Sequence, residues 1–515
     1  MNKQNAEAHT PLSPSLQANV QAIRSRFGES SDVVIRVFRS DAAPGRRLAI
    51  AYVDGIVDAE TINRSVMEPL MSLQLPEYVI EKGARLLEAL RGCVVSVGSM
   101  RDIHTLDEAL QYMADGLCVI MADGSAAALT ADVNGGEERS VGIAQTQTVI
   151  RGPQYGFVES LRTNISLIRR VIRSSSLHVQ IHKVGKQTHT NVAVLYVHGI
   201  VDEGILKEVY RRLAAIDIDG ILESGYIEEF IQDETFTLFP TLLNTERPDT
   251  VAAALLEGRV AIIVDGTPIA LMAPTTFFSF FQSPEDFYQR YDIATFIRVI
   301  RYVAYVVSML LPALYIAVTT YHQEMLPTTL LISLAAQREG IPFPGLVEAL
   351  LMEMTFEVLR EAGLRMPRAI GPAISIVGAL VLGQSAVQAG IVSAGMVIVV
   401  SFTAISNFVM PEFNMAATSR IIRFGFMLMA GMLGFFGIFV SGLFMLIHLA
   451  SLRSFGVPYM SPLAPGGAAQ GLFRDMFIRM PWWAIVMRPL DMKMRNPKRR
   501  PNKKKPPAQR HSGKP

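Results

Sequence analysis

The chain has 515 residues, too many for one hydrophobic core and enough for two or three domains. Half of its residues are apolar, and a formal net charge of +2 combines a near-neutral body with a basic end, because residues 488–515 hold eleven Lys or Arg side chains against one Asp. With only two cysteines, Cys93 and Cys118, a disulfide-framed fold is excluded and buried thiols in a reducing compartment are expected. Residues 1–14 lack the apolar core of a signal peptide, so we expect a disordered start and no export of the region that follows.

An internal repeat follows. Ser15-Leu-Gln-Ala-Asn19 matches Ser160-Leu-Arg-Thr-Asn164, and Tyr52-Val-Asp-Gly-Ile-Val-Asp58 matches Tyr196-Val-His-Gly-Ile-Val-Asp202. A third block, Asp-Gly at 123–124, matches Asp-Gly at 265–266. The offsets are 145, 144 and 142 residues, so three blocks agree on one period and indicate a duplication.

Each copy reads as a helix, strands, further helices and a strand pair. Short β-branched runs at 48–53 and 192–197 end at Asp or His followed by Gly, where a strand stops. We therefore predict an α/β soluble N-terminal region of two repeated subdomains, at 15–140 and 161–273, joined by a linker at 141–160.

The repeats carry no motif of an enzyme. Neither a dinucleotide-binding nor a phosphate-binding glycine pattern surrounds the strand ends, and Asp54 becomes His198 in the second copy. Asp58 and Asp202 recur just before predicted helices, where an N-cap explains them and a metal or catalytic role is the alternative. We expect no catalytic residue, no cofactor and no metal.

A helical multi-pass membrane domain is predicted over residues 296–453. Three uncharged runs, 302–323, 369–411 and 424–452, suit a bilayer, within which helices satisfy every backbone group. At about 1.5 Å per residue the 43-residue run is twice too long for one crossing, so it should fold back near residues 384–390. With crossings at about 296–320, 369–382, 391–410 and 424–449, we expect about four.

Aromatic residues mark the entry to this domain. Residues 274–295 are rich in Phe and Tyr, which suits the headgroup zone, although a core cluster is an equally consistent interpretation. Arg290, Arg298 and Arg301 would hold this end at the cytoplasmic surface.

Two shorter segments lie between the crossings. Residues 327–336 suggest a half-helix, and 345–362 an amphipathic helix with Leu351, Met354 and Val358 on one face. Its other face carries Glu353, Glu357 and Glu361, read either as a solvated face or as an acidic ring at a pore mouth in an assembly.

Small and uncharged polar side chains characterise the paired crossings and the last span. Small residues permit close helix packing, and glutamines are costly against lipid, so they either bind neighbouring helices or line a wet passage. The candidates for pore lining or helix packing are Ser375, Gly378, Ala379, Gln384 and Gln388. The candidates for close packing are Ala386, Gly390, Ala394, Gly431 and Gly434.

Apart from Arg298 and Arg301 at the start of the first, the predicted crossings hold no charged residue, which disfavours a proton-coupled transporter and favours a gated passage or a scaffold. The basic tail at 491–515, expected to be disordered, and the segment at 454–490 belong on the cytoplasmic side with the N-terminal region. That topology requires an even number of crossings, but it places Arg420 and Arg423 on the wrong side. No nucleic acid is expected as a partner of the tail.

Several long motifs resemble one family. Val149-Ile-Arg-Gly-Pro153, Pro342-Phe-Pro344, Glu353-Met-Thr-Phe-Glu-Val-Leu-Arg-Glu-Ala-Gly363, Arg368-Ala-Ile-Gly-Pro372 and Ser454-Phe-Gly-Val-Pro-Tyr459 are similar to segments of GerA-type spore germination proteins, the A subunits of germinant receptors. The resemblance covers roughly residues 15–490.

The resemblance implies a multi-pass protein of the spore inner membrane that takes part in signal transduction during germination, with both termini on the spore-core side. It implies a homo-oligomer, expected to be a pentamer, that forms a nutrient-gated channel for monovalent cations. It also implies two partners, a transporter-like B subunit that holds the nutrient and a lipoprotein C subunit. The alternatives are a paralogous A-like protein acting downstream with the dipicolinic-acid release machinery, and a membrane scaffold that conducts nothing.

Overall fold

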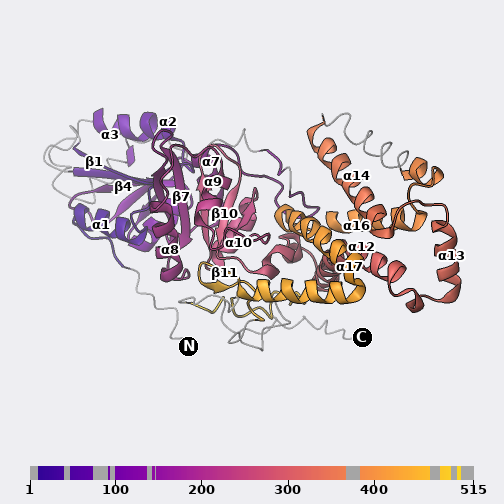
Figure 1. Ribbon diagram of the computed structural model, residues 1–515. Helices are drawn as coiled ribbons and strands as arrows, with labels where there is room; N and C mark the ends of the chain where they lie inside the picture. Colours follow the sequence, from indigo (N-terminus) through magenta and orange to yellow (C-terminus); the bar gives the residue numbers. More distant parts are fainter. Residues whose placement is uncertain are drawn as a thin grey trace, which may run out of the picture. The chain divides into compact units, whose positions relative to one another are not determined.

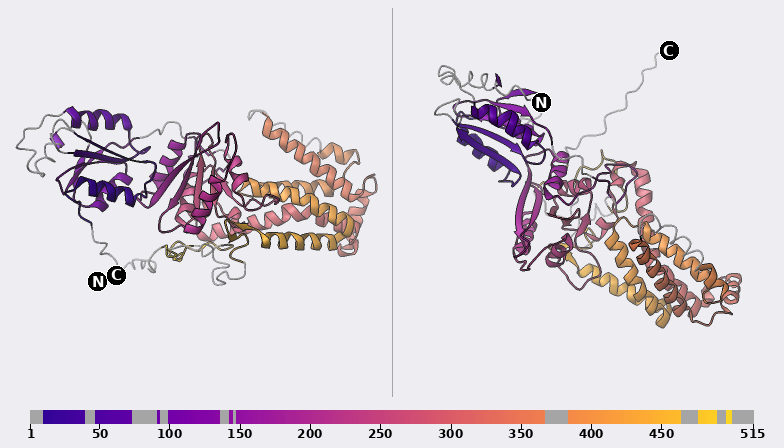
Figure 2. Two further views of the ribbon diagram at one scale, coloured as in Figure 1. Left: turned by 60° about the vertical axis from the view of Figure 1, so that its left-hand side comes forward. Right: turned by 90° about the horizontal axis from the view of Figure 1, so that it is seen from above.

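A computed structural model describes residues 10–39, 47–72, 91–92, 99–135, 142–144, 147–366, 383–463, 476–488 and 496–499. The chain divides into two compact units. The first, here called the repeat unit, comprises Met1–Asp233, Leu242–Pro274 and Ile485–Pro515, and the second, the helical unit, comprises Glu234–Thr241 and Thr275–Ala484. Each is described by itself (Figures 1 and 2).

The two halves of the repeat unit share one sheet topology. Both hold a five-stranded antiparallel sheet, in the order β1-β2-β4-β5-β3 and β6-β7-β9-β10-β8, so the predicted duplication is confirmed (Figure 1). In the first, the elements are α1 (Leu16–Arg26), β1 (Val33–Arg39), β2 (Arg47–Val53), α2 (Ala59–Thr61), η1 (Ile62–Met67), α3 (Glu68–Ser72), β3 (Met100–Ile103), α6 (Leu106–Ala114), β4 (Leu117–Ala122) and β5 (Ala128–Asp132). In the second, they are α7 (Leu161–Val171), β6 (Leu177–Val184), β7 (Thr190–Val197), α8 (Glu203–Ala214), α9 (Ser224–Ile231), β8 (Leu243–Thr245), α10 (Pro248–Leu256), β9 (Val260–Val264) and β10 (Ala270–Ala273).

The repeated motifs perform the same local task in both halves. Asn19 accepts a hydrogen bond from the backbone N–H of Ser13 and donates one to its carbonyl, at 2.8 and 2.7 Å, and Asn164 does so with Val158, at 2.8 and 2.6 Å. Each Asn thereby fixes the chain that enters its first helix. The carboxylates of Asp58 and Asp202 accept from backbone N–H groups at the starts of α2 and α8, so the N-cap interpretation is confirmed.

A buried ion pair joins the two halves. Arg169 on α7 donates to both carboxylate oxygens of Asp32, at 2.7 and 2.9 Å, and to the hydroxyl of Ser30 at 3.0 Å. Beside it, the ring of His178 on β6 occupies the space over Gly28, where a Cβ atom would lie 2.2 Å from the ring. Gly28 also has a φ of +62°, so any other residue there would be strained as well as blocked.

Cys118 lies on β4 in the core of the first half and is fully buried. Burial raises the pKa of its thiol to about 12. The C-terminal segment also belongs to the repeat unit, because Arg488 donates to the carbonyl of Leu256 and Arg499 pairs with Glu257, both at 2.8 Å.

The helical unit consists of η2 (Phe277–Phe281), α11 (Glu285–Tyr288), α12 (Tyr291–Thr320), η3 (Gln323–Met325), α13 (Thr328–Arg338), α14 (Gly345–Arg365), α16 (Ala394–Phe408), α17 (Phe413–Ser451) and a short hairpin of β11 (Arg453–Ser454) and β12 (Val457–Pro458). Two of these helices, α12 and α17, are long and apolar enough to cross a membrane, and α16 is a shorter apolar helix. The predicted half-helix at 327–336 corresponds to α13, of which no residue is buried.

Helix α17 is a hairpin and not one rod. Gly434 has non-helical angles, φ 61° and ψ −139°, and a Cβ atom at Gly437 would lie 2.1 Å from the carbonyl oxygen of Met429. Residues eight apart in a straight helix are separated by about 12 Å, so the chain reverses at Gly434.

Contacts at the other end of the hairpin agree. Thr418 donates to the carbonyl of Leu238 at 2.5 Å, and the imidazole of His448 lies 2.9 Å from the hydroxyl of the adjacent Thr237. A straight helix would separate Thr418 and His448 by about 45 Å. The single last span predicted at 424–449 is therefore wrong, since two antiparallel arms, residues 413–433 and 435–451, occupy this region.

Candidate functional site

Two oppositely charged pairs lie inside the helical unit, between α14 and the first arm of α17. Glu353 binds Arg423 at 2.5 Å, and Glu357 lies 3.5 Å from Arg420. Glu353 and Arg423 are almost fully buried, with side-chain exposures of 0% and 2%. We call Glu353, Glu357, Arg420 and Arg423 the charge ladder.

The spacing of these residues shows how the two helices run. Leu346 at the start of α14 lies against Gly431, where a Cβ atom would come within 2.6 Å of it, while Glu353 and Glu357 meet Arg423 and Arg420. Residue numbers rise on α14 as they fall on α17, so the helices are antiparallel. Gly431 permits this approach, as expected for a close-packing candidate.

Several polar atoms of the charge ladder are buried without a hydrogen-bond partner. They are Oε1 of Glu353, Oε1 of Glu357, Nη1 of Arg420, and Nε and Nη2 of Arg423. Removing these charges from water costs free energy that an ion pair with unsatisfied atoms recovers only in part. The ladder therefore fixes the register of the two helices more than it stabilises them.

The ladder corrects the prediction of a solvated acidic face. Glu353 and Glu357 point toward arginines, whereas Leu351, Met354 and Val358 on the opposite face are 38%, 54% and 63% exposed. The helix was interpreted as if water lay outside it, but charges inside and apolar side chains outside are what a lipid environment favours. Arg420 and Arg423, which the predicted topology placed on the wrong side, are paired inside the unit.

Glu361, the third acidic candidate, lies one turn beyond the ladder. It is exposed and pairs with Arg365 of its own helix at 2.7 Å. Together with Arg360, which binds Glu357, the ladder has a formal net charge of +1 and leaves no excess of negative charge. The charges of Glu353 and Glu357 are therefore matched by arginines of the same chain, and the acidic ring of an assembly stays a prediction.

A further buried carboxylate ties α14 to α16. Oε1 of Glu348 accepts hydrogen bonds from the backbone N–H and the hydroxyl of Ser393, at 2.6 and 2.5 Å, and Ser393 caps the start of α16. Nε of Arg338 lies 4.0 Å from the other carboxylate oxygen of Glu348.

Buried arginines also occur near the start of α12. Arg298 and Arg301 both bind Asp286, at 3.0 and 2.8 Å, and all three are buried. The prediction that these arginines reach out to the cytoplasmic surface is wrong, because α12 begins at Tyr291 and places them in the interior. Phe278, Phe280 and Phe281 are buried as well, and Phe281 stacks on Tyr302, so the core-cluster interpretation describes this segment.

The pore-lining and packing candidates fall into three groups. Ser375, Gly378 and Ala379 lie outside the described residues. Gln384 and Gln388 are exposed, and Ala386, Gly390 and Ala394 are half-buried. Gly434 forms the hairpin turn, where the Tyr321 hydroxyl lies 2.9 and 3.0 Å from the carbonyls of Gly431 and Met432.

Sequence analysis missed the polar contacts among α12, α16 and α17. Asn407 donates to the hydroxyl of Ser419 at 2.9 Å, and Ser308 lies 3.5 Å from the same hydroxyl. The charge ladder was missed too, although glutamates four apart and arginines three apart on two helices were a detectable signal.

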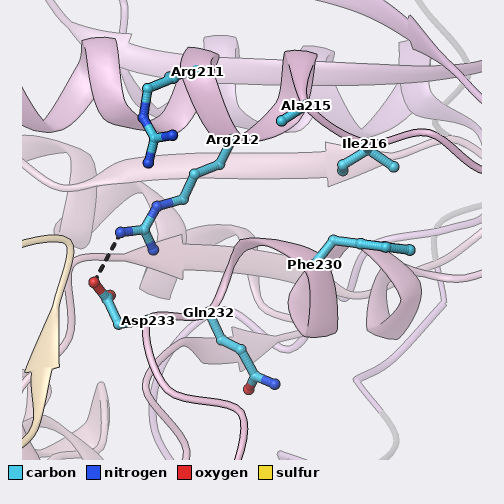
Figure 3. Close-up of a pocket in the computed structure, with 7 residues that line it drawn as sticks. All are labelled: Arg211, Arg212, Ala215, Ile216, Phe230, Gln232 and Asp233. Atoms are coloured by element: carbon cyan, nitrogen blue, oxygen red, sulfur yellow. Dashed lines mark hydrogen bonds and ion pairs between the residues drawn. The ribbon is translucent and has the colours of Figure 1, made fainter.

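The repeat unit contains a pocket of about 340 Å³ between the ends of α8 and α9 (Figure 3). It is lined by Arg211, Arg212, Ala215, Ile216, Phe230, Gln232 and Asp233. Glu208 accepts hydrogen bonds from Arg211 and Arg212, which lowers the pKa of its carboxyl to about 2, and Asp233 binds Arg212 at 2.8 Å. The charged side chains that line the pocket are thus paired with one another or with Glu208.

Comparisons with known proteins agree on a family. Residues 21–490 match the family model described as Bacillus/Clostridium GerA spore germination protein. Spore germination protein KA of Bacillus subtilis is 50% identical over 95% of this chain and 88% of its own length, and spore germination protein GerLA of Bacillus cereus is 37% identical over 94% and 97%.

Two further similarities concern the membrane and the repeat unit. The uncharacterized membrane protein YfkQ of Bacillus subtilis is 42% identical over 93% of this chain and 91% of its own, and with the two membrane-capable helices it indicates a membrane association. The crystal structure of the N-terminal domain of the A subunit of the Bacillus megaterium spore germinant receptor GerK3 is 35% identical, with a TM-score of 0.41, and covers 52% of this chain and 98% of that one. The chain belongs to the GerA family of spore germination proteins, which includes A subunits of germinant receptors.

Proposed function

We propose that this protein is the A subunit of a germinant receptor and that several copies form a nutrient-gated passage for monovalent cations in the spore inner membrane. The proposal rests on α14, whose Glu353 and Glu357 side chains point into the helical unit while the apolar side chains on its opposite face are exposed. The chain that contains this helix matches spore germination protein KA along almost its whole length. A transporter-like B subunit and a lipoprotein C subunit are the proposed partners.

The helices suggest a topology with both ends of the chain on one side. One end of the helical unit is marked by Thr418 and His448, and the other by Tyr321 and Gly434. Five described helical segments run between these two ends, namely α12, α14, α16 and the two arms of α17. The crossing expected at 369–382 lies outside the described residues and would add one further pass. Six passes in place of the expected four would return the chain to its starting side, where Arg488 and Arg499 bind the repeat unit.

Cysteine labelling tests this topology. Phe436 follows the hairpin turn and is 65% exposed, and Lys498 lies in the C-terminal segment. We expect a membrane-impermeant maleimide to label Phe436→Cys, and not Lys498→Cys, from outside sealed cells. Equal labelling of both would contradict six passes.

Uncharged polar groups are the proposed lining, since the ladder supplies no excess negative charge. We expect Gln384→Leu, or a bulky residue at Ala379, to reduce cation flux by at least tenfold without reducing the amount of protein. Flux is measured from potassium-loaded liposomes holding the full chain and both partners. A scaffold would leave these liposomes silent with the complex intact, and normal flux in both variants would rule out this lining.

A further inference from the structure

Helix α14 carries more glutamates than the facing arm of α17 has arginines. Glu353, Glu357 and Glu361 recur every four residues along one face of α14. Arg423 pairs with Glu353 and Arg420 with Glu357. Glu361 lies one turn further along α14 and is exposed, and among the described residues its ion pair is with Arg365 of its own helix. This face of α14 therefore offers three glutamates to two arginines of α17.

This arrangement provides a second register. If α14 moved one turn, about 5.4 Å, toward its own N-terminus, Glu357 would face Arg423 and Glu361 would face Arg420. The same two arginines would again be paired, and Leu350 would replace Leu346 over Gly431. Glu353 would move beyond Arg423, opposite Met427, and lose its partner.

Few of the residues that hold α14 in the observed register are fully buried. These are Gly345, Glu348, Ala349 and Glu353, and four apolar side chains of α14 pack against the core while only partly buried. Glu348 binds Ser393, so α16 must follow α14 or release it. One-turn displacements of a packed helix between two discrete positions are a known form of conformational switching.

We propose that α14 slides one turn along α17, exchanging its glutamates over Arg420 and Arg423, and that this slide separates the closed from the open state. The slide is a property of the chain alone, whereas its part in opening a passage rests on the proposed function. The resting state keeps Glu353 on Arg423, because the alternative leaves that carboxylate buried and unpaired.

The proposal assigns opposite effects to two glutamates. Glu353→Gln removes the ion pair with Arg423 that stabilises the observed register. It also removes the unpaired buried carboxylate that destabilises the second register, so it should favour the slide. Glu361→Gln removes a partner needed only in the second register, so it should oppose the slide. Glu339→Gln is a matched control, because Glu339 is exposed and lies outside the ladder.

Cross-linking in the full chain measures the register directly. Leu346→Cys with Gly431→Cys should form a disulfide in the observed register, and Leu350→Cys with Gly431→Cys in the second. With the native glutamates we expect the first pair to cross-link at least fivefold faster. In Glu353→Gln the second pair should be the faster, and adding Glu361→Gln should restore the first. An unchanged ratio in Glu353→Gln, or loss of both cross-links in a protein that elutes normally, would overturn the slide.

Potassium leak without nutrient measures the consequence. From liposomes with the full complex, Glu353→Gln should leak at least tenfold faster than the native chain or the Glu339→Gln control, and Glu353→Gln with Glu361→Gln should not. A register shift without any leak would leave the slide standing and overturn its part in opening. A leak with no register shift would support a channel and overturn the slide.

Discussion

Arg169 and Asp32 belong to different halves of the repeat unit, and their side chains form a two-bond ion pair that is almost completely buried. The Ser30 hydroxyl also donates to Oδ1 of Asp32, at 2.7 Å, and the guanidinium of Arg169 lies over the ring of Phe27. The two halves are thus joined by a buried ion pair, and losing either side chain would destabilise the junction because the other charge would stay buried without a partner.

Replacing Arg169 by Ala should destabilise the junction by about 3 kcal/mol, because it leaves the carboxylate of Asp32 buried and uncompensated. Arg162→Gln is the matched control: Arg162 also bridges the halves, to Asp54 at 2.6 Å, but is 58% exposed, so its loss should cost less than about 1 kcal/mol. Hydrogen exchange of the β6 amides in the full chain measures both. Equal exchange in the two variants would contradict the central role of Arg169.

The same junction should weaken in acid. Burial lowers the pKa of His178 to about 4, below its ordinary value of 6.5, so the unfolded chain binds a proton more readily than the folded one between these two values. Stability should therefore fall as the pH drops from 6.5 to 4, by up to about 3 kcal/mol. His178→Gln should flatten this profile when hydrogen exchange is measured across the range. A native profile that is already flat would contradict the burial argument.

Glu228 on α9 should act in the opposite direction. Burial raises the pKa of its carboxyl to about 7, so the folded state keeps the proton that the unfolded state loses above pH 4.5. The stability of the repeat unit should then decrease as the pH rises from 4.5 to 7. Glu228→Gln should gain about 1–3 kcal/mol at pH 8 and nothing at pH 4. Thermal unfolding of the full chain in detergent at the two values checks this expectation.

The hairpin turn of α17 should not tolerate a side chain at Gly434. Alanine there would adopt a φ of +61°, and its Cβ atom would lie 2.7 Å from the ring of His322, so we expect a loss of at least about 2 kcal/mol. Gly425→Ala is the control, since nothing lies within 4 Å of a Cβ atom at that position. Monodisperse protein recovered after heating in detergent measures both. If Gly434→Ala is as stable as Gly425→Ala, the turn is not where we place it.

The repeat unit was predictable because its signals are local. Ser15 and Asn19, and their counterparts 145 residues later, cap and fix a helix within a few residues of themselves, so their spacing carries the structure with it. The shared sheet order then follows from the duplication.

The helical unit was harder to predict because its structure depends on contacts between segments that are far apart in the sequence. Gly434 looks like any other glycine in an apolar run, and only the contacts of Thr418 and His448 with one short segment show that the chain turns there. The four-residue spacing of the glutamates on α14 correctly predicted that they share one face of the helix. That this face points into the protein could not be predicted from α14 itself, because the arginines that pair with them are about 60 to 70 residues away in the sequence.

The longer segment of the helical unit, Thr275–Ala484, is in sequence an insertion into the repeat unit, which breaks off at Pro274 and resumes at Ile485. Its helices are consequently tethered at both ends to one body, and severing the backbone at either tether alone would not free them. A protease cut after Pro274 or before Ile485 should leave fragments that co-migrate under native conditions and part only in denaturant, a behaviour that a domain hung on a single linker could not show.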